Sequence, residues 1–194
     1  MGNHFIHYFK IRLGIESSDT QTTEAEQAVI KRYATGKKNA VEIGVFEGFN
    51  TVLIANALDR NGKVYGIDPF TRGRMGLSYC KMITQYWLHK NKVSEKVNLV
   101  EKLSFDAPDD VPEIVDFVFI DGDHSYGGIE KDWTIFSKKV SPKGHIALHD
   151  TTAPPFQLWK SNMGSVQFFN DRIRHDSRFA LVETVDSLNV LQRL

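Results

Sequence analysis

A chain of 194 residues is long enough for one domain with a substantial core and too short for two domains of ordinary size. Its 24 basic and 24 acidic residues balance, so no overall charge favours nucleic acid or an anionic membrane as a partner. The single cysteine, Cys80, excludes an intramolecular disulfide and favours a reducing compartment, so we expect a cytoplasmic protein. No apolar run approaches the roughly 20 residues of a membrane span, and no targeting segment is indicated.

Short β-rich runs alternate with amphipathic segments, which is the pattern of βαβ units around a parallel sheet. Strands are predicted at residues 40–43, 63–67, 97–103, 117–120 and 145–149, and the fully apolar fourth strand is expected at the centre. The first predicted helix begins at a capping box formed by Thr23 and Glu26. Further helices are predicted over residues 51–58 and 75–92 and around residues 129–136 and 166–173.

The C-terminal part of the chain departs from this alternation. Two strand-like runs, residues 179–185 and 188–192, are separated only by Asp186 and Ser187, so they form a hairpin and not a crossover. We therefore predict an α/β fold with a doubly wound, mostly parallel seven-stranded sheet that ends in an antiparallel hairpin. Residues 1–22 are set apart as an N-terminal segment, in which Phe5, Tyr8 and Phe9 are expected to form a helical flap over the site.

Two glycines stand where the first strand turns into a helix. Gly44 lets the backbone leave the strand in a conformation that few residues tolerate, and Gly48 lets a ligand approach the helix N-terminus. Their G-x-x-x-G spacing is neither the nicotinamide fingerprint nor a phosphate-binding loop. Glu42 and Glu47 would repel a pyrophosphate, and they suit a ligand with a cationic sulfonium and amino group better.

Asp68 follows the second strand, about 20 residues after the glycine pair, where a carboxylate binds the two hydroxyls of a ribose. The structural alternative is that Asp68 starts a turn before Pro69 and that the glycines are ordinary loop glycines. Because both features follow consecutive strands, they together predict an adenosine-binding site at the carboxyl edge of the sheet.

These segments, with the run Ile-Asp-Gly-Asp-His-Ser-Tyr ending at Tyr126 and Leu-His-Asp-Thr ending at Thr151, carry a family resemblance. From about residue 23 to residue 151 the chain resembles the S-adenosylmethionine-dependent O-methyltransferases of the group with macrolide-sugar and aminocoumarin methyltransferases and cephalosporin hydroxylase-like proteins. The resemblance implies a Rossmann-like methyltransferase domain over residues 23–194 and O-methylation of a small hydroxylated acceptor, such as a sugar, glycoside or phenolic metabolite. The residues that it assigns to S-adenosylmethionine are Glu42, Gly44, Gly48, Asp68, Asp121 and, for the adenine side, Ser104.

Asp121, His149 and Asp150 follow the fourth and fifth strands, so the topology brings them to the same sheet edge. The resemblance implies that three acidic residues at these positions bind a divalent metal, usually magnesium, which orients a diol and activates the hydroxyl to be methylated. His149 departs from that pattern, because imidazole favours manganese, iron or zinc. The structural alternative makes Asp121 a helix cap, His149 a hydrogen-bonded core histidine and Asp150 a turn residue.

Asp123 and His124 are the candidates for a general base, because O-methylation removes a hydroxyl proton as the methyl group leaves sulfur. His124 is preferred, since imidazole side chains exchange protons near neutral pH. Its structural alternative is to cap the helix that begins near Tyr126.

Two other functions stay open on the sequence: a metal-dependent enzyme of the same fold with different chemistry, and a cofactor-binding protein without catalysis. The acid and base cluster argues against the second, because a protein that only binds has no need of it. The expected partner is a small-molecule acceptor, with no nucleic acid and no membrane, and the resemblance implies a homodimer.

Overall fold

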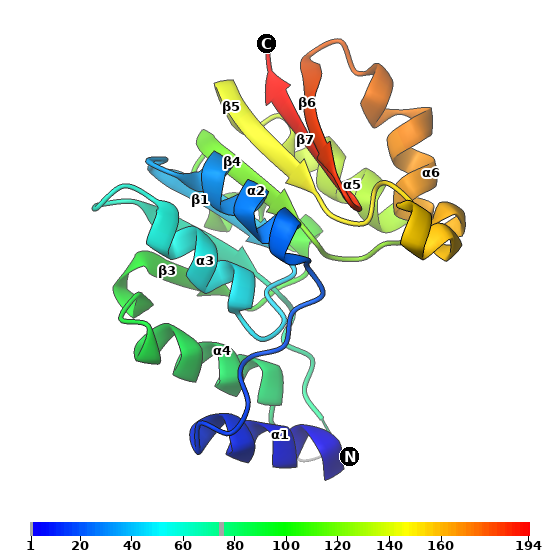
Figure 1. The fold of residues 1–194 in the computed structure, drawn as a ribbon. Coiled ribbons are helices and arrows are strands. Elements are labelled where there is room, and N and C mark those ends of the chain that lie inside the picture. The colour runs from blue at the N-terminus through cyan, green and yellow to red at the C-terminus, as the bar shows by residue number, and fades with distance from the viewer. Residues whose placement is uncertain (1, 74–75) are drawn as a thin grey trace.

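Seven strands form one sheet in the order β3-β2-β1-β4-β5-β7-β6 (Figure 1). The computed structural model describes residues 2–73 and 76–194. Strand β7 runs antiparallel to both of its neighbours, whereas the other adjacent pairs are parallel. This confirms the predicted mostly parallel, doubly wound sheet with a C-terminal antiparallel hairpin. The strands are β1 (Asn39–Ile43), β2 (Lys63–Ile67), β3 (Val97–Val100), β4 (Val115–Ile120), β5 (Val140–Leu148), β6 (Phe179–Val185) and β7 (Leu188–Arg193).

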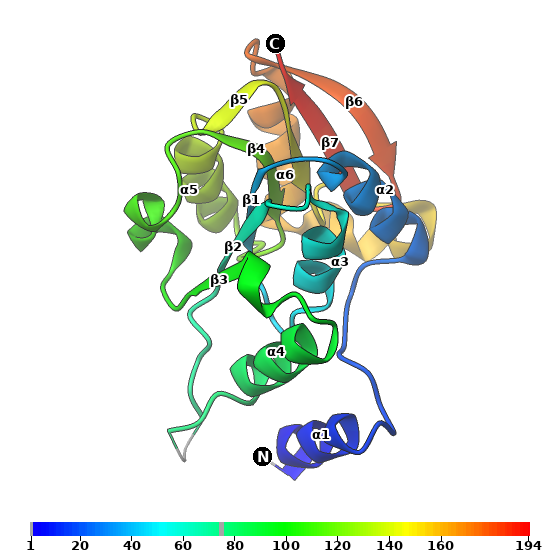
Figure 2. The same cartoon turned by 90° about the vertical axis from the view of Figure 1, so that its left-hand side faces the viewer.

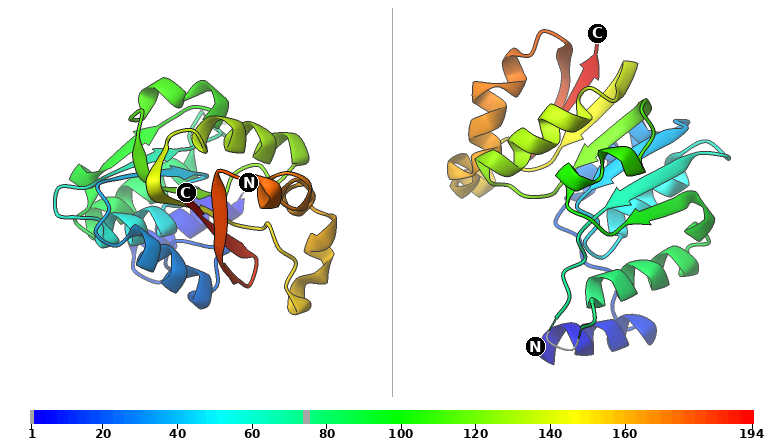
Figure 3. Two further views of the ribbon diagram at one scale, coloured as in Figure 1. Left: turned by 90° about the horizontal axis from the view of Figure 1, so that it is seen from above. Right: turned by 180° about the vertical axis from the view of Figure 1, so that it is seen from behind.

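Helices cover both faces of the sheet, as the turned views show (Figures 2 and 3). Alternation along β4 builds a core on each face: Phe117 and Phe119 pack with α2 and α3, whereas Val118 and Ile120 pack with α5 and α6. No helix in the described residues has the length and apolar character that a membrane crossing needs. The helices are α1 (Gly2–Arg12), α2 (Glu24–Ala34), α3 (Phe49–Ala57), α4 (Tyr79–Lys90), α5 (Tyr126–Phe136) and α6 (Gly164–Asp171).

Local capping sets where two of these helices begin. The predicted capping box is present at the start of α2, because Thr23 and Glu26 exchange side-chain to backbone hydrogen bonds. Helix α4 begins later than predicted, at Tyr79, because the Ser78 hydroxyl accepts a hydrogen bond from the backbone N–H of Lys81 and caps the helix there. Its predicted first residue, Met75, lies outside the described residues.

The largest differences from the predicted strand bounds are in β3 and β5. Strand β3 ends at Val100 and not at residue 103, because Leu103 leads into the 3-10 turn Ser104–Asp106. Strand β5 begins at Val140 and ends at Leu148, one residue before His149. His149 is therefore the first residue beyond the strand.

Helix α1 lies outside the two helical layers and packs against α4 (Figure 1). Its aromatic side chains meet the first residue of α4: the ring of Phe5 lies 6.1 Å from that of Tyr79, and the ring of Tyr8 lies 6.4 Å from it. The expected flap thus reaches the sheet edge from the α4 side, and its role as a moving flap stays a prediction.

Candidate active site

The ends of three neighbouring strands are in register. Ile43 of β1 pairs with Ile120 of β4, which pairs with Leu148 of β5. The residues that follow these three leave the sheet at one edge, as the topology predicts. They are Gly44, Asp121 and His149.

Both glycines of the loop after β1 have a left-handed backbone, with φ of +86° at Gly44 and +79° at Gly48. A Cβ at Gly44 would lie 2.1 Å from the carbonyl oxygen of Asp121, so a side chain there would collide with the end of β4. A Cβ at Gly48 would lie 2.8 Å from Cγ2 of Thr84 in α4. Gly48 is therefore needed for the close packing of the loop against α4, whereas Gly44 lies next to the end of β4, where the candidate site residues gather.

Asp68 fastens the glycine loop to the end of β2. Its Oδ2 accepts hydrogen bonds from the backbone N–H groups of Val45, at 3.0 Å, and Phe46, at 2.9 Å. Its Oδ1 accepts one of 2.7 Å from the N–H of Phe70. Asp68 thus stabilises the turn before Pro69, as the structural alternative proposed. The same carboxylate also lines the cavity described next.

A first cavity, of about 320 Å³, opens between the glycine loop and the ends of β2 and β4. Its volume is within the range of small-ligand sites. Leu103 and Phe105 give it an apolar wall. Residues predicted from sequence that also line it are Gly44, Asp68, Ser104, Asp121 and Asp123.

Two further residues of this cavity, Lys131 and Asp132, were not predicted from the sequence. The hydroxyl of Ser104 donates a hydrogen bond to the buried carboxylate of Asp132. Burial raises the pKa of Asp132 to about 6, although the bond from Ser104 opposes the shift. The helical periodicity of α5 could have predicted that Asp132 is buried, because it stands between Ile129 and Trp133 on the buried face of that helix.

Glu42 lies beneath the glycine loop. It is fully buried, and its Oε2 accepts a hydrogen bond of 2.5 Å from the hydroxyl of Thr51. Burial raises the pKa of Glu42 well above its usual value, although the bond from Thr51 opposes the shift. It supports the loop from below, and direct contact with the cofactor stays a prediction.

A second cavity, of about 280 Å³, adjoins the first on the other side of the loop. His124 and Asn50 line it, together with residues 19–21 of the segment before α2. Gly44 and Asp121 belong to the walls of both cavities. Asp121 therefore stands where two small molecules, one in each cavity, would meet.

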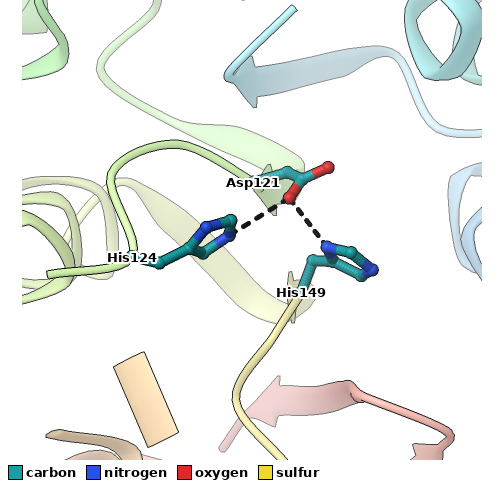
Figure 4. A group of neighbouring side chains, drawn as sticks. All are labelled: Asp121, His124 and His149. Carbon is teal, nitrogen blue, oxygen red and sulfur yellow. Dashed lines mark hydrogen bonds and ion pairs between the residues drawn. The ribbon is translucent and has the colours of Figure 1, made fainter. Parts of the chain in front are cut away.

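His149 is held between two carboxylates, as Figure 4 shows in part. Its Nδ1 donates to Oδ1 of Asp121 at 2.8 Å, and its Nε2 donates to Oε2 of Glu26 at 3.3 Å. Burial lowers the pKa of the imidazole, but both carboxylates outweigh burial and raise it to about 10. The pKa of Glu26 falls to about 2 against its own burial. His149 is therefore a buried imidazolium at neutral pH, which is the hydrogen-bonded core histidine of the structural alternative.

His124 approaches the same carboxylate from the other side. Its Nε2 lies 3.4 Å from Oδ1 of Asp121 (Figure 4). The same nitrogen lies 3.8 Å from Oδ2 of Asp150. This buried nitrogen has no hydrogen-bond partner among the residues that the structure describes. The helix cap is Ser125, whose hydroxyl accepts a bond of 3.0 Å from the N–H of Gly128. His124 is thus free of the capping role that the sequence left open.

Asp123, the other candidate base, is engaged locally. Its carboxylate accepts hydrogen bonds from the backbone N–H of Ser125, at 2.9 Å, and from the hydroxyl of Ser125, at 3.0 Å. These bonds shape the turn that precedes α5. Of the two candidates, His124 therefore has the freer side chain.

Asp150 lies beside His149, with its Oδ1 3.7 Å from Nδ1 of that ring. It has a left-handed backbone, with φ of +53°, and its Oδ1 accepts a hydrogen bond from Nζ of Lys160. Both side chains are buried, with 3% of Asp150 and 5% of Lys160 exposed. Lys160, in the 3-10 segment Pro155–Asn162, was not predicted from the sequence.

The expected metal ligands do not fit a metal site as the structure arranges them. Each ring nitrogen of His149 is bonded to a carboxylate, and Asp150 is bonded to a lysine. At this end of the sheet, the donor atoms that do lie within 4.8 Å of one another belong to Asp121, His124 and His149. A metal ion there would require the His149 imidazolium to lose a proton, because a metal binds only the neutral ring.

A separate titratable cluster joins α1 to the glycine loop. His7 lies 2.6 Å from Oε2 of Glu16 through Nδ1 and 3.0 Å from Oε2 of Glu47 through Nε2. The backbone N–H of Asp19 donates to the same Glu47 oxygen at 2.7 Å. Burial opposes protonation, but Glu16 and Glu47 raise the pKa of His7. Sequence reasoning singled out Glu47 only for its charge and missed the partner His7.

Comparisons with known proteins bear on this arrangement. Residues 41–151, more than half of the chain, match the family model described as a methyltransferase domain. A probable caffeoyl-CoA O-methyltransferase 2 of Dictyostelium discoideum is 26% identical over 187 residues, covering 89% of this chain and 77% of that protein. An uncharacterized protein of Acanthamoeba polyphaga mimivirus is 30% identical over 112 residues, 57% of this chain, and the chain spans half of that protein's length, 50%.

The same fold occurs in solved structures. The crystal structure of an O-methyltransferase from Bacillus cereus in complex with S-adenosylhomocysteine has a TM-score of 0.67 to this chain. The two are 16% identical, and the match covers 98% of this chain and 90% of that one. The likeness concerns the arrangement of the whole sheet and its helices.

Proposed function

Since this chain belongs to the S-adenosylmethionine-dependent O-methyltransferase family, we propose that it methylates a hydroxyl of a small acceptor such as a sugar, a glycoside or a phenolic metabolite. One observation carries the proposal. Asp121 and Gly44 line two adjoining cavities, one that also contains Asp68 and one that contains His124. Two such spaces are what transfer between two bound molecules requires.

The first cavity is assigned to the cofactor, S-adenosylmethionine. Asp68 has one acceptor site left on Oδ1 for a ribose hydroxyl, and Leu103 and Phe105 offer apolar surface to the adenine ring. Ser104 and Asp132 offer polar groups beside that surface. When bound, the cofactor supplies a methyl group on a cationic sulfonium.

His124 is assigned the role of general base in the second cavity. Its Nε2 faces Asp121, so the opposite ring nitrogen, Nδ1, is the one that can take the hydroxyl proton (Figure 4). As the proton moves to Nδ1, the acceptor oxygen gains electron density for its new bond to carbon, and the sulfur keeps the electron pair of the broken bond. Asp121 stabilises the imidazolium that forms, as the acid of a catalytic triad does.

Metal assistance, expected from the family resemblance, is a second form of the same proposal. It would need neutral His149 and a free Asp150 beside Asp121. The bonds from His149 to Glu26 and from Lys160 to Asp150 weigh against it.

The remaining expectations belong to the proposal as well. We place the reaction in the cytoplasm, supported by the lone Cys80, whose pKa burial raises to about 11 and so keeps unreactive. A small-molecule acceptor, without nucleic acid or membrane, is supported by the balanced charge. A homodimer is tested by the mass of the protein in solution.

Incubation with S-adenosylmethionine and a panel of phenols, catechols and glycosides, followed by mass spectrometry, tests the reaction. The expected product gains one methyl group on oxygen, and S-adenosylhomocysteine forms in equal amount. Tight binding of S-adenosylhomocysteine with no product from the panel or from extracts of the source cell would favour a binding protein without catalysis.

A further inference from the structure

Three acidic side chains near the carboxyl ends of β4 and β5 lie against cations of the chain itself. His149 bonds to Asp121 and Glu26, and Lys160 bonds to Asp150. In the family resemblance, the cation at this edge is a divalent metal. The question is what replaces it here.

His149 cannot serve as an ordinary metal ligand without losing one of its partners. A ligating histidine usually binds the metal through one nitrogen and donates the other N–H to a second group. Here Nε2 has such a second group in Glu26, but Nδ1 points its proton at Asp121, 2.8 Å away. Both ring nitrogens of His149 thus face carboxylates, which accept hydrogen bonds and cannot donate them.

Lys160 occupies Asp150 in the same way. Its ammonium group contacts the carboxylate in a buried setting, where only 5% of the lysine is exposed. An ammonium group is a compact point charge with three donors, and burying it is costly unless it is paired. The pair therefore balances both charges and takes up Oδ1 of Asp150.

Charge balance agrees with this arrangement. Three carboxylates, those of Glu26, Asp121 and Asp150, face two cations, so the cluster keeps one net negative charge. A net negative charge beside the two cavities suits a cationic sulfonium. A divalent ion placed on top of both cations would reverse the sign of the cluster.

We propose that His149 and Lys160 replace the divalent metal, so that this enzyme holds Asp121 and Asp150 with fixed cations and binds no metal ion at this edge. The inference rests on the proposed methyl transfer. His149 and Lys160 act as positioning residues: they fix Asp121, which in turn orients His124. The acceptor hydroxyl is then activated by His124 alone, which favours phenolic hydroxyls because they are more acidic than sugar hydroxyls.

Metal binding is tested directly, without an acceptor. The untagged full-length protein, purified without chelator, is dialysed and its metal content measured, and MnCl2, ZnCl2 and MgCl2 are titrated in by calorimetry. We expect far less than one ion per chain and no ion-dependent rise in melting temperature. One tightly bound ion per chain, lost in His149→Gln, would overturn the proposal.

A second experiment asks whether a variant can be made to bind a metal ion at this position. The double variant His149→Asp, Lys160→Met restores three acidic residues and frees Asp150, so MnCl2 should bind it and raise its melting temperature. Lys139→Met is the matched control, because Lys139 is also a buried lysine paired with a carboxylate, that of Glu113, away from this edge. It should behave as the wild type toward metal.

If the double variant unfolds without metal, its refolding by MnCl2 is itself the expected result. If it folds in neither condition, His149→Asp alone takes its place, and the measurements on the wild type still decide. Calorimetry with S-adenosylhomocysteine on the same preparation separates the two claims. Loss of that binding would contradict the proposed function, whereas a bound metal would contradict only the inference.

Discussion

The carboxylate of Asp68 accepts a hydrogen bond of 2.9 Å from the backbone N–H of Phe46, a residue whose φ is +52°. A non-glycine residue in the left-handed region needs support from its surroundings. Asp68 gives that support from the end of β2, and the same side chain faces the first cavity. One carboxylate thus shapes the glycine loop and remains available to the ribose.

Replacing Asp68 should therefore weaken cofactor binding through both roles. Asp68→Ala removes hydrogen bonds to a charged group, each worth about 1.5–3 kcal/mol, so affinity for S-adenosylhomocysteine should fall at least about tenfold. Calorimetry measures the loss. Asp116→Ala serves as the control, since Asp116 also accepts backbone hydrogen bonds, from residues 38 and 39, but lies outside both cavities. Equal affinity in Asp68→Ala and wild type would remove Asp68 from the cofactor site.

The cofactor side could be predicted because its signals are local. Gly44 and Asp68 each follow a strand directly, and register between parallel strands brings strand ends together. The hairpin of β6 and β7 could be predicted for the same reason, since two residues between strand-like runs leave no room for a crossover.

The charged network could not be predicted, because its partners come from distant parts of the chain. Glu26 lies 123 residues before His149, and its capping box already explained it. Lys160 lies in an irregular 3-10 segment that has no period to reveal a buried face. Asp150 lies beside His149 as the topology predicted, with 3.7 Å between its Oδ1 and Nδ1 of the ring, but no local signal predicts its bond to Lys160.

Gly44→Ala tests the close approach between the glycine loop and β4. The added Cβ would lie 2.1 Å from a backbone carbonyl, and the residue would keep an unfavourable positive φ, so the loop must shift. We expect loss of S-adenosylhomocysteine binding together with a lower melting temperature. Gly127→Ala is the control, because a Cβ there meets nothing within 4 Å. Unchanged binding in Gly44→Ala would show that the loop conformation is wrong.

The lowered pKa of His145 should make the folded protein less stable at acidic pH. Burial, with the charge of Lys37, lowers the pKa of His145 to about 4 from the usual 6.5. The unfolded chain therefore binds a proton below pH 6.5 that the folded chain refuses until about pH 4, so stability falls as pH falls through this window. His145→Phe keeps an aromatic ring against Tyr33 and should lose less melting temperature over that range than the wild type. Parallel curves for the two proteins would contradict the assignment.

We expect His7 to attach helix α1 to the glycine loop through Glu47. Glu47 is only 1% exposed, and His7→Ala leaves its Oε2 with the backbone N–H of Asp19 alone, so the loss of a hydrogen bond to a charged group should cost about 1.5–3 kcal/mol. We expect faster hydrogen exchange and proteolysis before residue 24 and weaker cofactor binding, since Glu47 belongs to the glycine loop. Lys10→Ala removes a half-exposed ion pair with Glu16 and should change little. If both variants behave alike, His7 does not anchor the helix.

His124 carries the prediction that bears most directly on the chemistry. The acceptor found by the methyl-transfer screen is needed here, because the role concerns the hydroxyl proton. Loss of a general base lowers the rate by about 10²–10⁴, so His124→Ala should lower kcat in that range. Affinity for S-adenosylhomocysteine should stay close to that of the wild type, because His124 lines the second cavity and not the first.

Ser125→Ala separates the base from the helix cap next to it. The Ser125 hydroxyl caps α5, so its loss should cost about 1 kcal/mol of stability and leave kcat nearly unchanged. Raising the pH should partly rescue His124→Ala, because an acceptor that ionises in solution no longer needs the base, whereas Ser125→Ala should show no such rescue. If His124→Ala instead loses stability and keeps its turnover, the proton goes elsewhere, and Asp123, which is tied to Ser125 but still lines the first cavity, becomes the side chain to replace next.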